Sequence, residues 1–456
     1  SSQRKEGARV FDVNIHSIQA VKTIGKGQTA LNDFWATMNV SHRGLHHKTF
    51  QGHLKKLFKP AAEEAANNIF MSAVTAVKKV YSEMEVGFTK NVTVVYDGTW
   101  LTRGHSSHIG VGCITEFHTG LVLDSVVLSN FCLGCSLGPA ECDPTYLQWR
   151  QQHQCQKNTD VGSGRMEVEA ALQLFGRSLA KNDLRYTAVV SDGDSCVFQA
   201  LQDEQPYGFI AVTKEDCINH VKKRMGTGLR SIVSKAKKGE PLGGKGGLTQ
   251  QLIKKLTNYY GLAISKNTND VAAMRNAVMA AYYHVTSTDS DPHHELCPPG
   301  PLSWCEQRAA EAKKEAPPAH KYKLMSRVCQ AMLPVYERLS DVHLLERCQS
   351  GRTQNAAESL HSVIWSALSK DEHASLFAVQ AAVSEAVMRY NSGSQNAYSE
   401  MCATLGVCPG ALAVHRAQEK DQERLKKSSK AHQMKRQRCK KMPDNKDVKY
   451  YSPGAF

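Results

Sequence analysis

Residues 91–100 read NVTVVYDGTW, and residues 185–195 read RYTAVVSDGDS. β-Branched and aromatic side chains dominate both runs, so each predicts a β-strand. Asp97 closes the first run and Asp192 closes the second, which places two carboxylates at predicted strand ends. A third carboxylate, Glu358, lies in TQNAAESLHSVIWSAL, which predicts the first turns of a helix. Because loops begin where strands end, each acidic residue taken alone also suits a surface position.

The elements between the two aspartates indicate the fold class. In chain order they are strands at 107–117 and 121–131, a helix at 166–180, the strand before Asp192, a helix at 195–204 and a strand at 207–213 (YGFIAVT). A turn at 118–120 predicts that the strands at 107–117 and 121–131 are antiparallel. The order β-β-β-α-β-α-β is that of RNase H-like nucleases and integrases, which are α/β proteins with a mixed sheet. Their carboxylates lie on the first strand, just after the fourth strand and on a later helix.

Three carboxylates that converge require cations to offset their repulsion. Hard oxygen ligands suit Mg²⁺ or Mn²⁺. Asp97, Asp192 and Glu358 therefore predict a site that holds two such ions and carries out phosphoryl transfer. Asp194 is close enough in sequence to be the second ligand in place of Asp192.

Charge and length narrow the function further. The 456 residues include 57 Lys and Arg against 43 Asp and Glu, a net charge of +14, which favours polyanionic partners such as DNA, although a solvated basic surface gives the same count. The length suits two to four domains. We expect no membrane span, because no run of eighteen uncharged apolar residues occurs. The chain opens SSQRKEG without Met or a secretory signal, so we expect a truncated start.

Fourteen cysteines in a chain expected to be intracellular indicate metal sites before disulfides. The tightest group lies in a predicted zinc-binding loop at 131–160, where CxxC and HxC spacings can complete a tetrahedral Zn²⁺ shell. Its expected ligands are Cys132, Cys135, His153 and Cys155, with Cys142 as a possible substitute. Buried free cysteines are the alternative.

A second zinc group is split along the chain. A CxxH in DCINHVKK and an HxxC in DPHHELCPPG meet only if folding joins an insertion to the core. The expected ligands are Cys217, His220, His294 and Cys297. His293 competes with His294, and Cys305 competes with Cys297.

The remaining segments are mostly helical. We expect helices over 1–88, the core over 89–215, a helical insertion over 216–345 and core helices carrying Glu358 over 346–415. The basic tail, 416–456, includes a Lys- and Arg-rich stretch that suits a solvated tail, a nuclear import signal or phosphate contacts.

Several motifs in this order resemble one known family. They are DGTWLTRGHSSHIGVG, CLGC with WRQQHQCQKN, GSGRMEVEAAL, SDGDS, CINHVKKRMGTGLR, NYYGLAI, HHELCPPGPLSWC and RTQNAAESLHSVIW. They look like the Mutator-like transposase domain, particularly the Kolobok-type cut-and-paste transposases. The similarity covers nearly the whole chain.

The resemblance implies a nuclear DDE transposase that cuts and joins DNA at the terminal repeats of its own element and in target DNA. Asp97, Asp192 and Glu358 match its catalytic positions, and end pairing implies at least a homodimer. Relatives tend to have Asn where this chain has Ala357 and His361. This departure leaves two alternatives: a domesticated or decayed DNA-binding protein stabilised by zinc, and an RNase H-like nuclease without strand transfer.

Five further side chains lie near the predicted site in sequence. Lys222, Lys223 and Arg224 directly follow the CxxH and are candidates for phosphate contacts. Trp100 and Trp365 flank the carboxylates, where packing in the core is a more common role for tryptophan than stacking on a base.

Overall fold

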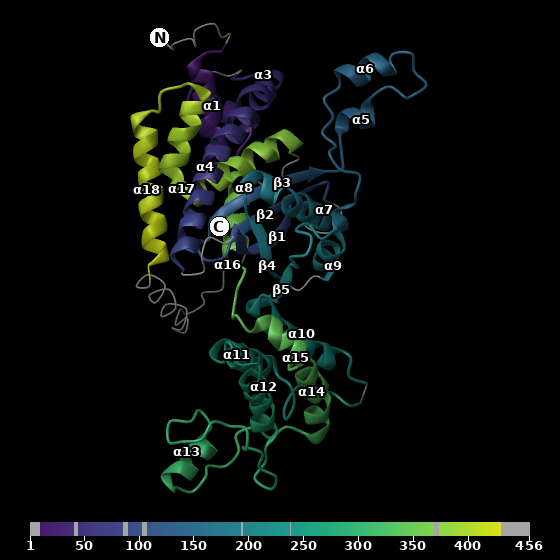
Figure 1. Cartoon of the computed structure of the whole chain (residues 1–456), viewed down its shortest axis with the longest axis vertical. Coiled ribbons are helices and arrows are strands. Elements are labelled where there is room, and N and C mark those ends of the chain that lie inside the picture. Colours follow the sequence, from purple (N-terminus) through teal and green to yellow (C-terminus); the bar gives the residue numbers. More distant parts are fainter. Residues whose placement is uncertain are drawn as a thin grey trace, which may run out of the picture. The chain divides into compact units, whose positions relative to one another are not determined.

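The computed structural model describes residues 10–40, 44–84, 90–102, 107–192, 195–237, 239–368 and 374–429. These residues form two compact units (Figure 1). One unit combines the described residues up to Ile69 with those from Gln380 onward, and the other spans Phe70–Val379. The second unit contains Asp97, Asp192 and Glu358.

A five-stranded mixed sheet forms the centre of this unit, with the strand order β3-β2-β1-β4-β5. The strands are β1 (Asn91–Trp100), β2 (Ile109–Glu116), β3 (Val122–Ser129), β4 (Arg185–Ser191) and β5 (Thr213–Asp216). β1, β2 and β3 pair antiparallel, whereas β4 pairs parallel with both β1 and β5. The predicted order of strands and helices and the mixed sheet are therefore confirmed.

Alternation along β1 gives the sheet two different faces, because successive side chains of a strand point in opposite directions. Tyr96 faces a large apolar core that includes Leu174 of α7 (Ser163–Gly176) and Val197 of α9 (Ser195–Glu204). Val95 faces the other way and packs against Ala357 of α16 (Asn355–Ala367). The short helix α8 (Ser178–Asn182) leads from α7 into β4.

One strand prediction is corrected. Residues 207–213 were expected to be a strand, but Tyr207–Ile210 form turns, and β5 begins only at Thr213. Gly208 has a φ of +60°, which bends the chain, and the Tyr207 hydroxyl accepts a hydrogen bond from the backbone N–H of Tyr186. The apolar run is thus used to close the core beneath the sheet, not to extend a strand.

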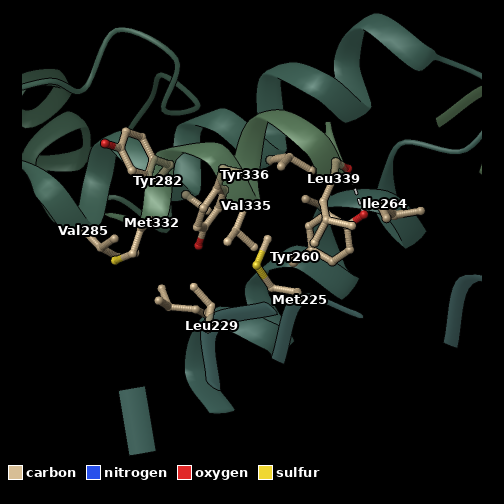
Figure 2. Close-up of a cluster of buried hydrophobic side chains, with 14 of the residues drawn as sticks. Met225, Leu229, Tyr260, Ile264, Tyr282, Val285, Met332, Val335, Tyr336 and Leu339 are labelled. Atoms are coloured by element: carbon tan, nitrogen blue, oxygen red, sulfur yellow. Dashed lines mark hydrogen bonds between the residues drawn. The ribbon is translucent and has the colours of Figure 1, made fainter. Parts of the chain in front are cut away.

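A helical insertion between β5 and α16 has a hydrophobic core of its own. Its helices are α10 (Ile218–Ser234), α11 (Gln250–Lys266), α12 (Val271–Thr286), α13 (Glu306–Lys313), α14 (Ser326–Leu339) and α15 (Val342–Cys348). Figure 2 shows Met225, Tyr260 and Tyr336 in this core, and the Tyr260 hydroxyl donates a hydrogen bond to the carbonyl of Leu339 at 2.9 Å. The insertion is therefore a packed subdomain and not a long loop.

The other unit is helical throughout its regular structure. It contains α1 (Asp12–Thr23), α2 (Gln28–Thr37), α3 (His47–His53), the π-helix η1 (Leu54–Phe58), the first part of α4 (Lys59–Glu83), most of α17 (Leu376–Leu405) and α18 (Ala411–Ser428). An ion pair between Lys22 and Glu385 joins its two chain segments. The predicted tail beyond Ser429 lies outside the described residues. Among the described helices, none is long and apolar enough to cross a membrane.

Candidate active site and metal centres

The register of the parallel strands brings Asp97 and Asp192 together. Val95 of β1 pairs with Val190 of β4. Asp97 lies two residues further along β1, and Asp192 directly follows the end of β4. Since side chains two residues apart along a strand point the same way, Asp97 lies with Val95 on the face that α16 covers, and the charge of Asp192 acts on it there. Asp97 does not close its strand as predicted: β1 continues to Trp100 because it still pairs with β2, while its pairing with β4 ends at Val95.

Glu358 reaches the same site because the residues before α16 anchor this helix to β1. The buried amide of Gln354 donates a hydrogen bond to the carbonyl of Tyr96, one residue before Asp97, at 3.2 Å. Arg352 forms an ion pair with Glu215 of β5 at 2.6 Å and also lies over the ring of Phe117. The first turn of α16 is thereby fixed beside the strand that carries Asp97.

A fourth carboxylate, Glu167, also belongs to the site. It lies in the first turns of α7, and a methyl group built on Gly98 would lie 3.1 Å from its Cγ and Cδ atoms. Gly98 directly follows Asp97. Because Gly98 has no side chain, the side chain of Glu167 can lie against it. From the sequence, MEVEAAL predicts a core helix and no site residue. The signal that could have identified Glu167 is an acidic residue between the buried residues Met166 and Val168.

The other three carboxylates act on Asp97. Burial, followed by the charges of Glu167, Asp192 and Glu358, raises the pKa of Asp97 from 3.8 to about 8, against a hydrogen bond from the Gly98 amide that lowers it. Asp97 is only 20 % exposed. A divalent cation would reverse this repulsion, because it is the largest local charge in such a site. The all-oxygen donor set therefore fits Mg²⁺ or Mn²⁺.

The CxxH motif belongs to this site and not to the second zinc group. Nε2 of His220 lies 3.2 Å from Oε1 of Glu358. The buried Sγ of Cys217 accepts a hydrogen bond from the backbone N–H of Gln354. Cys217 also packs with Val95 and Ala357. The expected group of Cys217, His220, His294 and Cys297 is thus corrected: β5 and α10 direct the CxxH toward Glu358.

The two positions that depart from the family pattern are both packed against the site. Ala357 is fully buried between the helix and the sheet. Nδ1 of His361 lies 3.6 Å from Oδ2 of Asp97, and the His361 side chain is 13 % exposed. Each side chain therefore contacts the elements that position the carboxylates.

A wide cavity of about 1220 Å³ lies beside Asp192 and is bordered by α10, α14 and α15. Its cationic lining residues are Lys223, Arg224, Arg338 and Arg347. Lys223 and Arg338 are exposed, and Arg224 donates a hydrogen bond to the Asp192 carbonyl at 2.9 Å. Lys222 lies along α11, beside Gly261. Of the three candidate phosphate contacts, Lys223 and Arg224 border the cavity.

Both tryptophans near the site make structural contacts. The indole N–H of Trp365 donates to the Thr99 hydroxyl at 2.8 Å, and that of Trp100 donates to the Ser163 carbonyl at 3.3 Å. These bonds tie α16 and the start of α7 to the end of β1. The tryptophans thus support the site from its sides.

The first Cys/His group comes together as expected. Ligand atoms of Cys132, Cys135, His153 and Cys155 all lie within 4.8 Å of one another. His153 Nε2 lies 3.3 Å from both Cys132 Sγ and Cys135 Sγ. Cys135 Sγ lies 3.4 Å from Cys155 Sγ. These four residues are called the Cys132 cluster. Its loop also contains α5 (Leu133–Leu137) and α6 (Tyr146–Gln152), which bring the CxxC and HxC pairs together.

The Cys132 cluster is suited to a metal such as zinc. Partial burial raises the pKa of Cys132, but hydrogen bonds from the amides of Gln156 and Cys135 outweigh it and lower that pKa to about 6, which favours the thiolate that binds metal. Trp149 stacks on His153 with the ring centroids 4.4 Å apart and holds the imidazole in place. Cys142 is exposed and is not part of the group.

A second Cys/His group forms within the insertion. It contains His284, His294, Cys297 and Cys305, again within 4.8 Å, and is called the His284 cluster. His294 is buried, whereas His293 is turned to the surface and contacts Asp291 at 3.0 Å, so His294 is the member of that pair that joins the group. Cys305 joins Cys297 and does not replace it. Sequence reasoning missed His284, which lies at the end of α12 in AAYYHV.

The sequence matches one known protein family. A family model described as Mutator-like transposase matches residues 1–305 of the 456. The chain belongs to the Mutator-like transposase family. No curated protein and no solved structure matches it.

Family membership makes this Mutator-like transposase a DNA-processing enzyme that binds DNA. The matched residues include the sheet, Asp97, Asp192, the CxxH and both Cys/His groups, while Glu358 lies beyond them. The alternative second ligand, Asp194, lies outside the described residues.

Proposed function

We propose that the chain is a DDE transposase of the Kolobok type, with an RNase H-like core, that cuts DNA at the ends of its own element and joins it to target DNA. The observation that carries this proposal is the electrostatic coupling of Asp97 to Asp192, Glu358 and Glu167 at one end of the sheet. The four carboxylates lie on β1, directly after β4, on α16 and on α7, and divalent cations would offset the repulsion that they exert on Asp97. The strand order β3-β2-β1-β4-β5 also supports the RNase H-like assignment.

In this mechanism Asp97, the central carboxylate, would hold two Mg²⁺ or Mn²⁺ ions together with Asp192 and Glu358. Bound there, the ions would lower the pKa of a water and stabilise charge on the in-line transition state. His220 lies against Glu358 and fixes its orientation, while Gln354 fixes the helix that carries it. Strand transfer would use the same carboxylates with a DNA 3′-hydroxyl in place of water, and it needs no covalent enzyme intermediate.

The cavity beside Asp192 offers a path for the DNA backbone. Lys223 and Arg338 expose positive charge along it, and Lys223 Nζ lies 3.8 Å from Oε1 of Glu358. A phosphate that contacts these side chains lies next to the carboxylates. Such contacts are independent of sequence and depend strongly on salt. We infer a nuclear location and pairing of element ends by at least a homodimer from the same proposed function.

Cleavage of DNA that carries candidate element ends, with Mg²⁺ or Mn²⁺, tests the proposal. We expect Asp97→Asn to lower the cleavage rate by orders of magnitude, because it removes the charge that holds the ions. DNA affinity should survive, because it depends on Lys and Arg contacts with phosphates. Asp160→Asn is the matched control, since Asp160 is 91 % exposed.

Two other results would replace the proposal. If wild type and Asp97→Asn both bind DNA and neither cuts it with either ion, the chain is a domesticated or decayed DNA-binding protein. Restoring Asn at Ala357 and His361 is then the decisive follow-up. If wild type cuts DNA but never joins a 3′ end to a target, the chain is an RNase H-like nuclease without strand transfer.

A further inference from the structure

The His284 cluster has the geometry of a tetrahedral metal shell. Nδ1 of His294 lies 3.5 Å from Cys305 Sγ and 3.8 Å from Cys297 Sγ, and Nδ1 of His284 lies 3.9 Å from Cys297 Sγ. Bond lengths of about 2.3 Å for Zn–S and about 2.0 Å for Zn–N place S and N ligands roughly 3.6 Å apart in a tetrahedron. The three distances lie close to this value.

Burial and charge favour Zn²⁺ among the metals that such ligands bind. His294, Cys297 and Cys305 are all buried. Two thiolates and two neutral imidazoles around Zn²⁺ have no net charge, so a filled site avoids the penalty of an uncompensated buried ion. Soft sulfur with imidazole nitrogen in a four-coordinate closed shell is typical of structural zinc.

Two residues outside the shell fix the orientation of His294. Nε2 of His294 lies 2.9 Å from Nε2 of His320, and Nδ1 of His320 lies 2.7 Å from Oδ1 of Asp289. If Nδ1 of His294 binds metal, its proton is on Nε2 and is donated to His320. His320 then carries its own proton on Nδ1 and donates it to Asp289. One assignment of protons satisfies both contacts, as expected for partners of a metal-bound histidine.

We propose that His284, His294, Cys297 and Cys305 bind one structural Zn²⁺, and that Asp289 and His320 are positioning residues for this site. The inference does not depend on the proposed cleavage reaction. All four ligands belong to the insertion, so the ion holds the segment after α12 to the start of α13 and does not join the insertion to the sheet. His284 and His294 also line a cavity of about 770 Å³, together with Trp304.

Metal analysis of the full chain tests the ligands. With the Cys132 cluster also filled, wild type should contain two Zn²⁺ per chain. Cys305→Ser should contain one, and the matched control Cys329→Ser should keep two, because Cys329 lies in the same insertion outside the cluster. In the Co²⁺-loaded protein, Cys305→Ser should also lose part of the absorption bands that tetrahedral thiolate ligands produce.

The outer residues require a different measurement. His320→Leu should keep the zinc stoichiometry but weaken zinc affinity about 10- to 100-fold in competition with a chelator. His320→Gln can still accept the hydrogen bond from Nε2 of His294, so its zinc affinity should lie between those of His320→Leu and wild type. His293→Asn is the control and should leave affinity unchanged. Equal affinities for His320→Leu and wild type would refute the role of His320 and Asp289.

Thiol labelling of the wild type covers the case in which Cys305→Ser does not fold. Cys297 and Cys305 should react with N-ethylmaleimide only after zinc is removed, whereas Cys329 should react equally with and without zinc. Labelling of Cys297 and Cys305 that does not change on zinc removal, or a disulfide between them, would overturn the proposal. A wild type with two Zn²⁺ that Cys305→Ser retains would overturn it as well.

Discussion

Replacing Asp97 with Asn should stabilise the metal-free sheet. Burial and three nearby carboxylates raise the pKa of Asp97 to about 8, so the folded chain binds a proton that the unfolded chain has released near pH 7. A raised carboxyl pKa lowers stability as pH rises from about 4 to about 8. Asn has the same shape and no charge, so the variant escapes this loss.

The size of the effect follows from the shift. At about 1.4 kcal/mol per pH unit, the change from 3.8 to about 8 makes wild type less stable than Asp97→Asn by roughly 4 kcal/mol at pH 7 and roughly 2 kcal/mol at pH 5. Adding Mg²⁺ should reverse the order, because the ion binds the wild-type carboxylates and stabilises the folded state by mass action.

Hydrogen exchange of peptides from β1, corrected for intrinsic exchange at each pH, measures this free energy locally and avoids averaging over the two units. Asp124→Asn is a matched control in the same sheet. Asp124 is also buried, but it forms ion pairs with Arg177 and Lys181 at 2.7 Å. Its loss should destabilise the sheet by roughly 3 kcal/mol. Destabilisation of the sheet by Asp97→Asn would refute the proposed effect of the neighbouring carboxylates on Asp97. A gain in stability that is the same at pH 5 and pH 7 would refute it as well.

Three further predictions concern other parts of the molecule. Glu167→Gln should lower cleavage at limiting Mg²⁺ at least tenfold and raise the Mg²⁺ concentration needed for half-maximal rate, whereas Glu169→Gln on the same helix should change neither. Lys223→Ala and Arg338→Ala should each weaken binding of unrelated DNA sequences alike and reduce the salt slope by about 1, which a salt titration measures. Cys132→Ser should release one Zn²⁺ per chain and increase proteolysis within 131–160 without lowering exchange protection in β1; unchanged zinc content would contradict the assignment.

Local patterns were sufficient for β1 to β4 and for the first Cys/His group, but not for the strand expected at 207–213. NVTVVYDGTW forms β1 as predicted, although the strand continues past Asp97 to Trp100, because β-branched and aromatic side chains fit a pleated, buried surface. Cys132, Cys135, His153 and Cys155 could be grouped because each pair is two or three residues apart and the pairs lie in one loop. Short separations in sequence limit the distance between side chains before any folding is known.

Only the tertiary structure decided which distant residues meet. CxxH and HxxC have the right spacing to share a metal, yet α10 turns His220 toward Glu358, while the end of α12 supplies His284 to His294. Glu167 enters the active site because Gly98 leaves room beside β1, a contact across 69 residues that no local pattern contains. Sequence by itself determines chemistry that depends on neighbours along the chain. Contacts between distant segments depend on strand register and helix packing, which are set by the burial of the whole core.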